Sequence, residues 1–560
     1  MRRRRFISGA LAGGAALAAA CRAPSRRSST GSSGTAANAG SFDESSLTPQ
    51  QGGTFQTVGY RILEHLNPYK VVGPNVNFYF RGIYDTLVSY DYTPFTDYRE
   101  KYKLVGSLAE SWEMPDHNTY VFHLRRGVNW QDGTPFTAAD VKWSIEYMSD
   151  PANRIAAGDD FRAVASTSMP DDFTLRVAMK QPQVAFLEGM IATPIAVILP
   201  RHVFDRGDQF EKVAVGTGPF KVASYEQQKG ISYVANKQFW RQGQPYLDGW
   251  KLLAPTDEAA RLAGFTAGQN DVLHLTDRRQ VNAVLPLVKG ARMWQFAREI
   301  TADLYLKLDR PPFNDKRVRQ AVQAAIDRRA LLKTLHGGDG LMNPPGINAV
   351  AKGWALPQSE LDKLPGWRQP KEQDIQEAKQ LLAQAGYPNG GLSFTLTHDQ
   401  TLDYVGSDAT VLAEQLRQIG VTMNIQPLEG PVHTKNLVSG SYQADLDASG
   451  TSSPQNNLWQ VRFHSGGFNN SIPVKDPEAD RLLDAQLQEF DQEKRKALCL
   501  DFERLLAKEV YIIPLTADPG YLVLQPYVHG WIDTLALNVN DGDWARTWFD
   551  QKGAPKGRQA

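Results

Sequence analysis

Cysteine is scarce in this chain, and its charges balance. Only two of the 560 residues, Cys21 and Cys499, are cysteines, so the fold is not a small scaffold held together by several disulfides. Basic and acidic residues each number 61, and removing residues 1–20, which carry four arginines and no acid, leaves a small acidic excess. A nucleic-acid-binding protein would carry a basic excess, and we therefore expect no nucleic-acid partner.

Motifs for common catalytic and cofactor chemistry are also missing. The chain contains no HExxH, GxSxG, GxxxxGK(S/T) or CxxC pattern. The segment GTGPF at residues 216–220 lacks the spacing of a dinucleotide-binding loop, and its proline would block a following helix. The ten histidines are scattered, and the closest two, His117 and His123, lie six residues apart. We therefore expect no catalysis, no cofactor and no bound metal.

A long apolar run occurs only at the start of the chain, and it is too short to span a bilayer comfortably. Four arginines precede an uncharged segment from Phe6 to Ala20, and Cys21 follows, an order typical of an export signal. Ala18–Ala20 followed by Cys21 resembles a bacterial lipobox, in which the cysteine becomes the lipidated first residue of the mature chain. We predict a signal peptide over residues 1–20 and a lipid anchor on Cys21. The protein would then lie in the cell envelope, in the periplasm or on the outer face of the cytoplasmic membrane.

The export route stays open at this level. Arg3–Ile7 resembles the twin-arginine motif, but ordinary signals are basic too. A disordered basic tail, the remaining alternative, has no reason to carry an apolar segment that ends in Ala-Ala-Ala-Cys. Residues 21–50 are rich in Ser, Gly, Ala and Thr and cannot bury enough apolar surface to fold, so they are predicted to be a flexible tether. With Cys21 lipidated no disulfide can form, and Cys499 is predicted to be a small buried residue on a helix.

The first half of the chain contains a block of strands and turns that ends in a helix. Tyr120–Leu124 alternate as in a strand, and Asp132-Gly133 is a turn signal. Thr137 is a good helix N-cap and Asp140 follows three residues later, which predicts a helix over 138–148.

From about residue 300 the pattern changes to alternating helices and strands. Residues 315–335 carry one apolar stripe and predict a single helix, which Gly337 and Gly338 end. A strand at Phe394–Leu396, a helix that ends at Gly420 and a strand at Val421–Ile425 form a βαβ unit. Such a unit is typically parallel with a right-handed crossover.

Aromatic residues are plentiful, and most are expected in the core. We interpret Trp112, Trp143, Trp240 and Trp250 in this way. Residues 442–470 differ, because they begin like a strand and continue as a long loop rich in Asn, Ser, Gly and aromatics. Loops at strand ends in α/β lobes bind ligands, and amides beside an aromatic face suit a polar organic molecule. A well-packed surface loop is the alternative.

Several of these segments together resemble one protein family. Leu108–Glu113, Tyr120–Trp130 and Asp132–Val141 closely resemble the signature of the extracytoplasmic solute-binding family 5 of ABC importers, which comprises dipeptide-, oligopeptide- and nickel-binding proteins. Further blocks agree and follow in the expected order, namely Gly216–Phe220, Asn236–Trp240, Pro245–Asp248, Pro312–Ala321 and Ala378–Pro388. The resemblance covers about residues 50–550, and the blocks in series are highly specific.

The resemblance implies an α/β fold of the periplasmic-binding-protein type (type II, cluster C), with two hinged lobes that enclose the ligand. Lobe I would comprise residues 51–296 and 513–552, with an extra subdomain at 85–205, and lobe II would comprise 297–512. Ligand contacts from both lobes would stabilise the closed state. The partners would be an ABC permease and its ATPase, the membrane through the lipid anchor, and a small-molecule or peptide ligand bound by a monomer.

The ligand itself stays open. Peptide-binding members hold the free amino group of the ligand with an aspartate in the loop after the strand that begins here near Tyr442. Residues 448–454 contain no acid, and Asp445 and Asp447 are predicted to lie in the strand. A buried ammonium without a carboxylate partner is costly, which weighs against a peptide. A peptide, an oligosaccharide or another polar organic solute, and a metal chelate therefore all remain.

The resemblance also suggests where the ligand is bound. From the second lobe we expect Thr451, Asn456, Asn457 and Trp459 to contact it, and from the first lobe Tyr60 and Asn67, because the loop after the first strand faces the cleft in this family. An exported hydrolase is the alternative from another class, and a receptor that feeds a sensor or acts as an export chaperone is a third.

Overall fold

A computed structural model describes residues 44, 46–59, 62–70, 79–91, 103–153, 155, 161–191, 196–351, 353–449, 458–467, 472–531 and 543–558. All of them belong to the unit Ala39–Ala560. Cys21 and most of the predicted tether lie outside the described residues. The lobe boundaries given above stay predictions.

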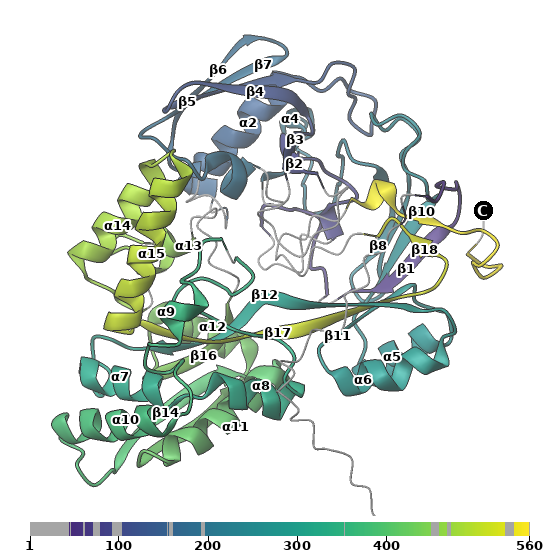
Figure 1. The fold of residues 1–560 in the computed structure, drawn as a ribbon. Coiled ribbons are helices and arrows are strands. Elements are labelled where there is room, and N and C mark those ends of the chain that lie inside the picture. Colours follow the sequence, from purple (N-terminus) through teal and green to yellow (C-terminus); the bar gives the residue numbers. More distant parts are fainter. Residues whose placement is uncertain are drawn as a thin grey trace, which may run out of the picture. The chain divides into compact units, whose positions relative to one another are not determined.

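The largest sheet has seven strands and contains two unusually long ones, β12 (Arg292–Leu306) and β17 (Ile512–Leu524), which run antiparallel side by side (Figure 1). Its strand order is β11-β17-β12-β16-β14-β15, and β13 also pairs with β17. The other members are β11 (Val272–Leu275), β13 (Leu341–Met342), β14 (Leu392–Asp399), β15 (Val421–Leu428) and β16 (Ala444–Ser449). Every residue of β17 is buried, as expected for a central strand covered on both faces.

The predicted βαβ unit is present. β14 and β15 pair in parallel from Leu392 opposite Val421 to Asp399 opposite Leu428, and α11 (Asp403–Arg417) connects them. β16 adds to the other side of β14, also in parallel, and then pairs antiparallel with β12. The carboxyl ends of β14 and β16 therefore meet at one edge of the sheet.

Two four-stranded sheets lie in the first half of the chain. One has the order β1-β10-β9-β8 and the other β4-β5-β7-β6. Their strands are β1 (Thr54–Val58), β4 (Ala109–Asp116), β5 (Thr119–Leu124), β6 (Val164–Asp171), β7 (Thr174–Met179), β8 (Phe220–Glu226), β9 (Gly230–Ala235) and β10 (Gly249–Leu253). Short pairs are formed by β2 (Val88–Tyr90) with β3 (Leu104–Gly106), and by β18 (Val528–His529) with β19 (Trp548–Phe549).

The helix expected after Thr137 is confirmed as α2 (Ala138–Ser149), and its capping box is complete. The Thr137 hydroxyl accepts a hydrogen bond from the Ala139 amide at 3.3 Å, and Asp140 accepts one from the Thr137 amide at 3.1 Å. The remaining helices are α4 (Arg201–Asp205), α5 (Glu258–Thr266), α6 (Arg278–Val284), α9 (Gln358–Leu361), α10 (Glu372–Gln384), α12 (Gly430–Ser439), α13 (Leu458–Phe463), α14 (Pro477–Gln488) and α15 (Gln492–Glu509).

The single helix predicted over 315–335 is wrong. The structure has two helices, α7 (Lys316–Ala325) and α8 (Arg328–His336). Ile326 adopts an extended conformation, and the Asp327 side chain accepts hydrogen bonds from the amides of Arg329 and Ala330. Asp327 thus acts as a new N-cap in the middle of the continuous apolar stripe. Gly337 ends α8 in the left-handed conformation at a φ of 66°, as its position predicted.

The core is divided into separate apolar clusters. The largest draws on residues between Phe55 and Trp294 and again on 522–554, whereas a second lies wholly within 302–515. Trp250 is fully buried, and Trp112, Trp143 and Trp240 are partly buried against the first cluster. Cys499 is fully buried, as predicted, and burial raises the pKa of its thiol to about 12.

Within the described part of the chain, no helix combines the length and the apolar character needed to cross a membrane.

Candidate functional site

Four of the six residues expected to bind ligand, Tyr60, Thr451, Asn456 and Asn457, lie outside the described residues. Asn67 and Trp459 are described, and both are buried. Asn67 organises a turn, since its side-chain oxygen accepts a hydrogen bond from the Tyr69 amide at 3.0 Å. Its amide nitrogen donates to a carboxylate oxygen of Glu211 at 3.4 Å. Both ends of the Asn67 side chain are therefore engaged within the protein.

Trp459 lies in α13 and belongs to an apolar cluster with α14 and α15. Only 1% of its surface is exposed, its ring centroid lies 5.0 Å from that of Phe502, and its indole nitrogen donates to the Gly346 carbonyl at 3.0 Å. These contacts use both the apolar face and the polar group of the side chain. They favour a packing role for Trp459, and its contact with a ligand stays a prediction.

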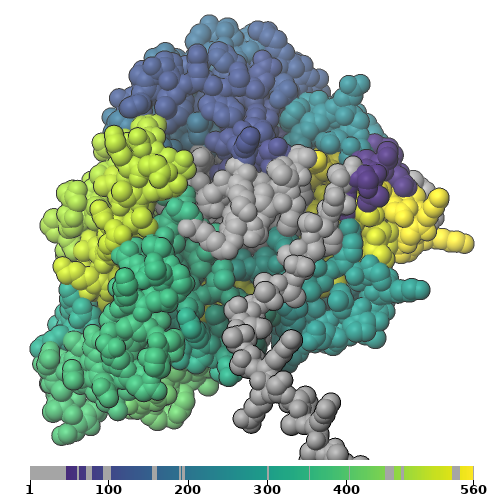
Figure 2. Space-filling view, viewed as in Figure 1, coloured from purple at the N-terminus to yellow at the C-terminus, as the bar shows by residue number. Residues whose placement is uncertain are grey.

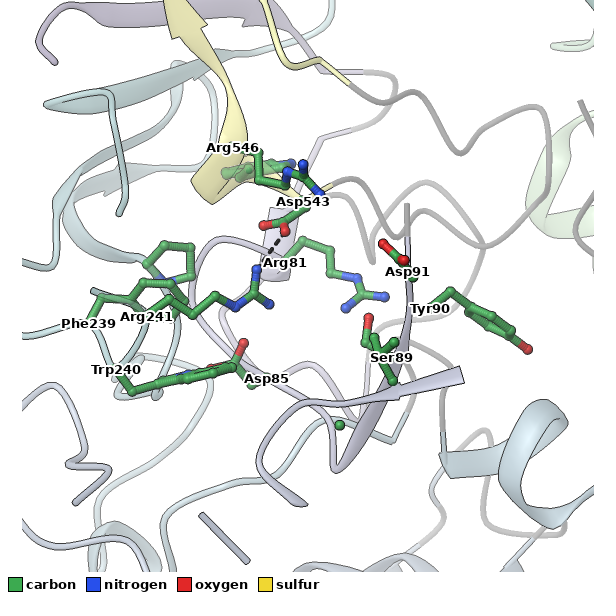
Figure 3. Close-up of a pocket in the computed structure, with 14 residues that line it drawn as sticks. Arg81, Asp85, Ser89, Tyr90, Asp91, Phe239, Trp240, Arg241, Asp543 and Arg546 are labelled. Carbon is green, nitrogen blue, oxygen red and sulfur yellow. Dashed lines mark hydrogen bonds and ion pairs between the residues drawn. The ribbon is translucent and has the colours of Figure 1, made fainter. Parts of the chain in front are cut away.

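A pocket of about 310 Å³ lies between β2, the segment after β9 and the segment around Trp544 (Figure 3). Its charged lining combines three arginines with three aspartates, namely Arg81, Arg241, Arg546, Asp85, Asp91 and Asp543. Phe239 and Trp240 form an aromatic wall, over which the Arg241 guanidinium lies 4.9 Å from the Trp240 ring.

The charges of this pocket pair with one another. Arg241 contacts Asp543 at 2.5 Å, and Figure 3 shows its guanidinium between Asp543 and Asp85. Asp85 is buried and accepts hydrogen bonds from the Thr217 hydroxyl at 2.9 Å and from the Trp240 indole at 3.0 Å. Burial raises the pKa of Asp85, and Arg241 opposes that rise. The pocket is polar and charge-balanced, so the chemistry that it offers is hydrogen bonding to a small polar molecule.

A second polar feature lies on the large sheet, where the sequence analysis identified no site. Asp408 of α11 and Asp518 of β17 are both buried, and burial together with the nearby Asp518 raises the pKa of Asp408 well above its ordinary value. The sequence contained one indication of Asp408. Val405, Ala409 and Leu412 form a buried apolar stripe at helical spacing on α11, and position 408 lies within this stripe. An acid in that stripe is anomalous. Asp518 gave no signal, since only the sheet order brings it near α11.

Metal binding finds no support within the described residues, where no group of three or more His, Cys, Asp or Glu side chains is arranged to hold an ion. The loop after β16, which the sequence analysis singled out, is outside the described residues from 450 to 457.

Comparison with known proteins gives a consistent result. Residues 103–470 match the family described as bacterial extracellular solute-binding proteins, family 5 Middle. The chain is similar to the glutathione-binding protein GsiB of Salmonella choleraesuis, with 27% identity over 435 residues that cover 74% of this chain and 81% of the relative. The same protein of Shigella boydii is 29% identical over 330 residues, which cover 58% of this chain and 62% of the relative.

Two solved structures share the fold. The oligopeptide-binding protein AppA of Bacillus subtilis, in complex with a nonapeptide, superposes with a TM-score of 0.75 at 21% identity and covers 90% of this chain and 100% of its own. The binding protein AgaA of A. tumefaciens, in complex with agropinic acid, gives a TM-score of 0.73 at 23% identity, over 89% and 99%. At this identity the likeness shows the fold alone, and it confirms the predicted two-lobed α/β architecture.

Proposed function

The chain belongs to the bacterial extracellular solute-binding proteins of family 5, the solute receptors of ABC importers, and we propose that it captures a peptide or another small polar organic solute and delivers it to a membrane permease. The family match over residues 103–470 carries this proposal. The similarity to a glutathione-binding protein supports a small peptide-like solute as the first candidate. An oligosaccharide is the alternative within the same fold.

Binding would proceed by closure of two hinged lobes around the solute. The long strands β12 and β17 support this view. Both run from the apolar cluster that includes residues 55–294 to the cluster within residues 302–515. Two such strands can bend together with little loss of hydrogen bonding, because their pairing already shifts register between Ala297 and Thr301.

Contacts between segments next to the sheet β4-β5-β7-β6 and the end of α14 support a closed arrangement. The Val184 amide donates to the Leu487 carbonyl at 2.9 Å, and the rings of His117 and Phe490 stack with centroids 4.4 Å apart. Figure 2 shows the corresponding blue and yellow-green surfaces adjoining each other. Such contacts would form on closing and break on opening, so that the permease would receive the closed, loaded form.

A lipid on Cys21 and the tether of residues 21–50 would keep the receptor close to its permease while leaving it free to turn. One anchor of this kind lets a monomer serve a permease and its ATPase. Intact-mass analysis of membrane-extracted protein tests the anchor, because Cys21→Ala should remove the lipid mass and release the protein from the membrane fraction.

The test of solute capture begins with the protein purified from its native host. Mass spectrometry of the material released on unfolding should find one small polar organic solute, and the refolded, stripped protein should bind that solute again with a raised melting temperature. Conversion of the solute into a product would instead support an exported hydrolase. Release of no solute, together with no thermal shift from peptides or oligosaccharides, would overturn the proposal.

A further inference from the structure

We infer that Asp408 and Asp518 form a subsite that holds an ammonium group of the solute. This inference rests on the proposed receptor function and names the chemical class of its ligand, an organic solute that carries a protonated amine. The subsite lies on α11 and β17, away from the loop after β16 in which the resemblance led us to look for an acid.

Asp408 is the observation that carries the inference. Only 1% of its surface is exposed, and neither carboxyl oxygen has a hydrogen-bond partner in the described structure. Burying a carboxyl group without a partner costs free energy of folding, and the cost is greater for its ionised form. A binding protein would retain such a group if a ligand supplied the missing donors.

Asp518 is the second acid of the subsite. It is 2% exposed, accepts a hydrogen bond from the Thr516 hydroxyl at 2.7 Å, and lies 3.4 Å from the Nε2 atom of His336 at the end of α8. Opposite it, the pairing of β12 slips between Ala297 and Thr301. On this side of β17, Asp518 therefore has no regular pairing partner in β12, whereas β13 pairs with Ala517 on the other side.

The sheet places Asp518 close to the end of β16. Thr301 of β12 is opposite Ala517 of β17 on one side and opposite Ser449 of β16 on the other. Asp518 therefore lies one residue from the row of the sheet in which β16 ends. The carboxylate that residues 448–454 lack can thus be supplied from the neighbouring strand and from α11.

The charges around the subsite favour a cation. Asp447 of β16 joins the two acids in raising the pKa of Tyr404, whose burial is the main cause of that rise, and Arg298 opposes it from 5.3 Å above the Tyr404 ring. Three carboxyl groups and one guanidinium therefore act on Tyr404. His336 is a further titratable group, and it lies beside Asp518. The pKa of Asp408 is well above its ordinary value because of burial and the adjacent Asp518, so Asp408 keeps its proton in the absence of a cation.

An ammonium group fits this environment better than a metal ion does. It has three N–H donors and no acceptor, and two carboxylates with free lone pairs complement it. The described residues hold no cluster suited to a metal, as noted above. Entry of the cation would favour the ionised form of Asp408, with release of its proton to solvent, and would allow one charge-assisted hydrogen bond to each carboxylate.

The experiment uses the isosteric variants Asp408→Asn and Asp518→Asn of the purified protein, with Glu414→Gln, an exposed position on the same helix, as the matched control. The probes are trialanine and glutathione, each compared with its N-acetylated form, and the solute released from wild-type protein after reaction with dansyl chloride. Binding is measured by titration calorimetry and apo stability by thermal melting.

We expect the released solute to carry a dansyl group and N-acetylation to abolish binding of the probe that the wild type accepts. Asp408→Asn and Asp518→Asn should each weaken binding roughly 10- to 100-fold, the usual effect of losing one hydrogen bond to a charged group. Apo Asp408→Asn should melt at or above the wild-type temperature, because a buried acid without hydrogen-bond partners is gone. Glu414→Gln should change neither quantity.

Tight binding of a solute without an amine, or unchanged affinity in both Asn variants, would overturn the subsite and leave the receptor function intact. Failure of the wild type to bind any solute would overturn both. An Asn variant that loses binding together with a large drop in apo melting temperature would show a structural role for that aspartate, and would also contradict the subsite.

Discussion

The indole nitrogen of Trp459 donates a hydrogen bond to the backbone carbonyl of Gly346, 113 residues earlier in the chain, at 3.0 Å. This bond and the contact with Phe502 attach α13 to the segment before α9 and to α15. Trp459 therefore fixes the position of α13.

Replacing Trp459 by alanine should therefore lower the free energy of unfolding by about 3–5 kcal/mol, as for other large buried aromatics. Trp459→Phe keeps the ring contact, loses the hydrogen bond and should lower it by about 1 kcal/mol. Urea unfolding of the apo protein measures both. If Trp459→Ala instead weakens ligand binding with apo stability intact, then the side chain contacts the solute, as the sequence analysis expected.

Glu503 should make stability fall with rising pH. It is fully buried on α15 and accepts hydrogen bonds from the amides of Gly346 at 3.1 Å, Ile347 at 2.8 Å and Leu356 at 2.7 Å. Burial raises its pKa from 4.5 to about 7. Between these two values the folded chain holds a proton that the unfolded chain has lost, so folding is progressively disfavoured as pH rises through this window.

Glu503→Gln removes this titration. From pH 4 to pH 8 the wild type should lose roughly 3 kcal/mol of unfolding free energy relative to the variant. Glu493→Gln on the same helix, where the side chain is 81% exposed, is the control and should follow the wild type. Parallel pH profiles for wild type and Glu503→Gln would show that Glu503 has the same pKa in the folded and the unfolded chain, and would contradict this prediction.

The capping box of α2 should contribute measurably to stability. Thr137→Ala removes the acceptor of the Ala139 amide and should cost about 1 kcal/mol, whereas Thr137→Ser keeps the hydroxyl and should cost little. Both effects are measured as the shift in the urea midpoint of the unfolding transition that includes α2 and the sheet β4-β5-β7-β6. Equal midpoints for Thr137→Ala and the wild type would mean that the box does not limit the stability of this region.

The stacking of His117 on Phe490 should act on closure rather than on folding. Phe490→Ala removes an aromatic contact worth about 0.5–1.5 kcal/mol and should speed solute release about two- to tenfold with an unchanged apo melting temperature. Stopped-flow dissociation measures the rate. Val438→Ala, at an exposed position on α12, is the control. A release rate equal to that of the wild type would show that this contact does not stabilise the closed state.

Local features were predictable from the sequence, because their causes are local. The capping box at Thr137 and the βαβ unit around α11 follow from side-chain spacing within a few turns of chain, and both are confirmed. The break between α7 and α8 was missed because the apolar stripe continues through Ile326, whereas the chain uses Asp327 to begin a second helix.

The candidate subsite could not be predicted from the sequence, for a different reason. Asp408 and Asp518 are 110 positions apart, and only the strand order of the large sheet brings the end of β16, the irregular part of β12 and Asp518 together. Trp459 was equally misleading, since an aromatic after a polar loop gives no indication of whether it faces a ligand or a core. Sequence spacing reports on secondary structure, and these sites depend on tertiary packing.

Solute capture is tested most directly by calorimetric titration of the stripped protein with the solute that it releases on unfolding. One molecule should bind per chain, with an affinity that Asp408→Asn weakens and Glu414→Gln leaves unchanged, and the solute should be recovered chemically intact afterwards. Recovery of a converted product, or the absence of any heat of binding from the released solute, would contradict the assignment of this chain as a solute receptor.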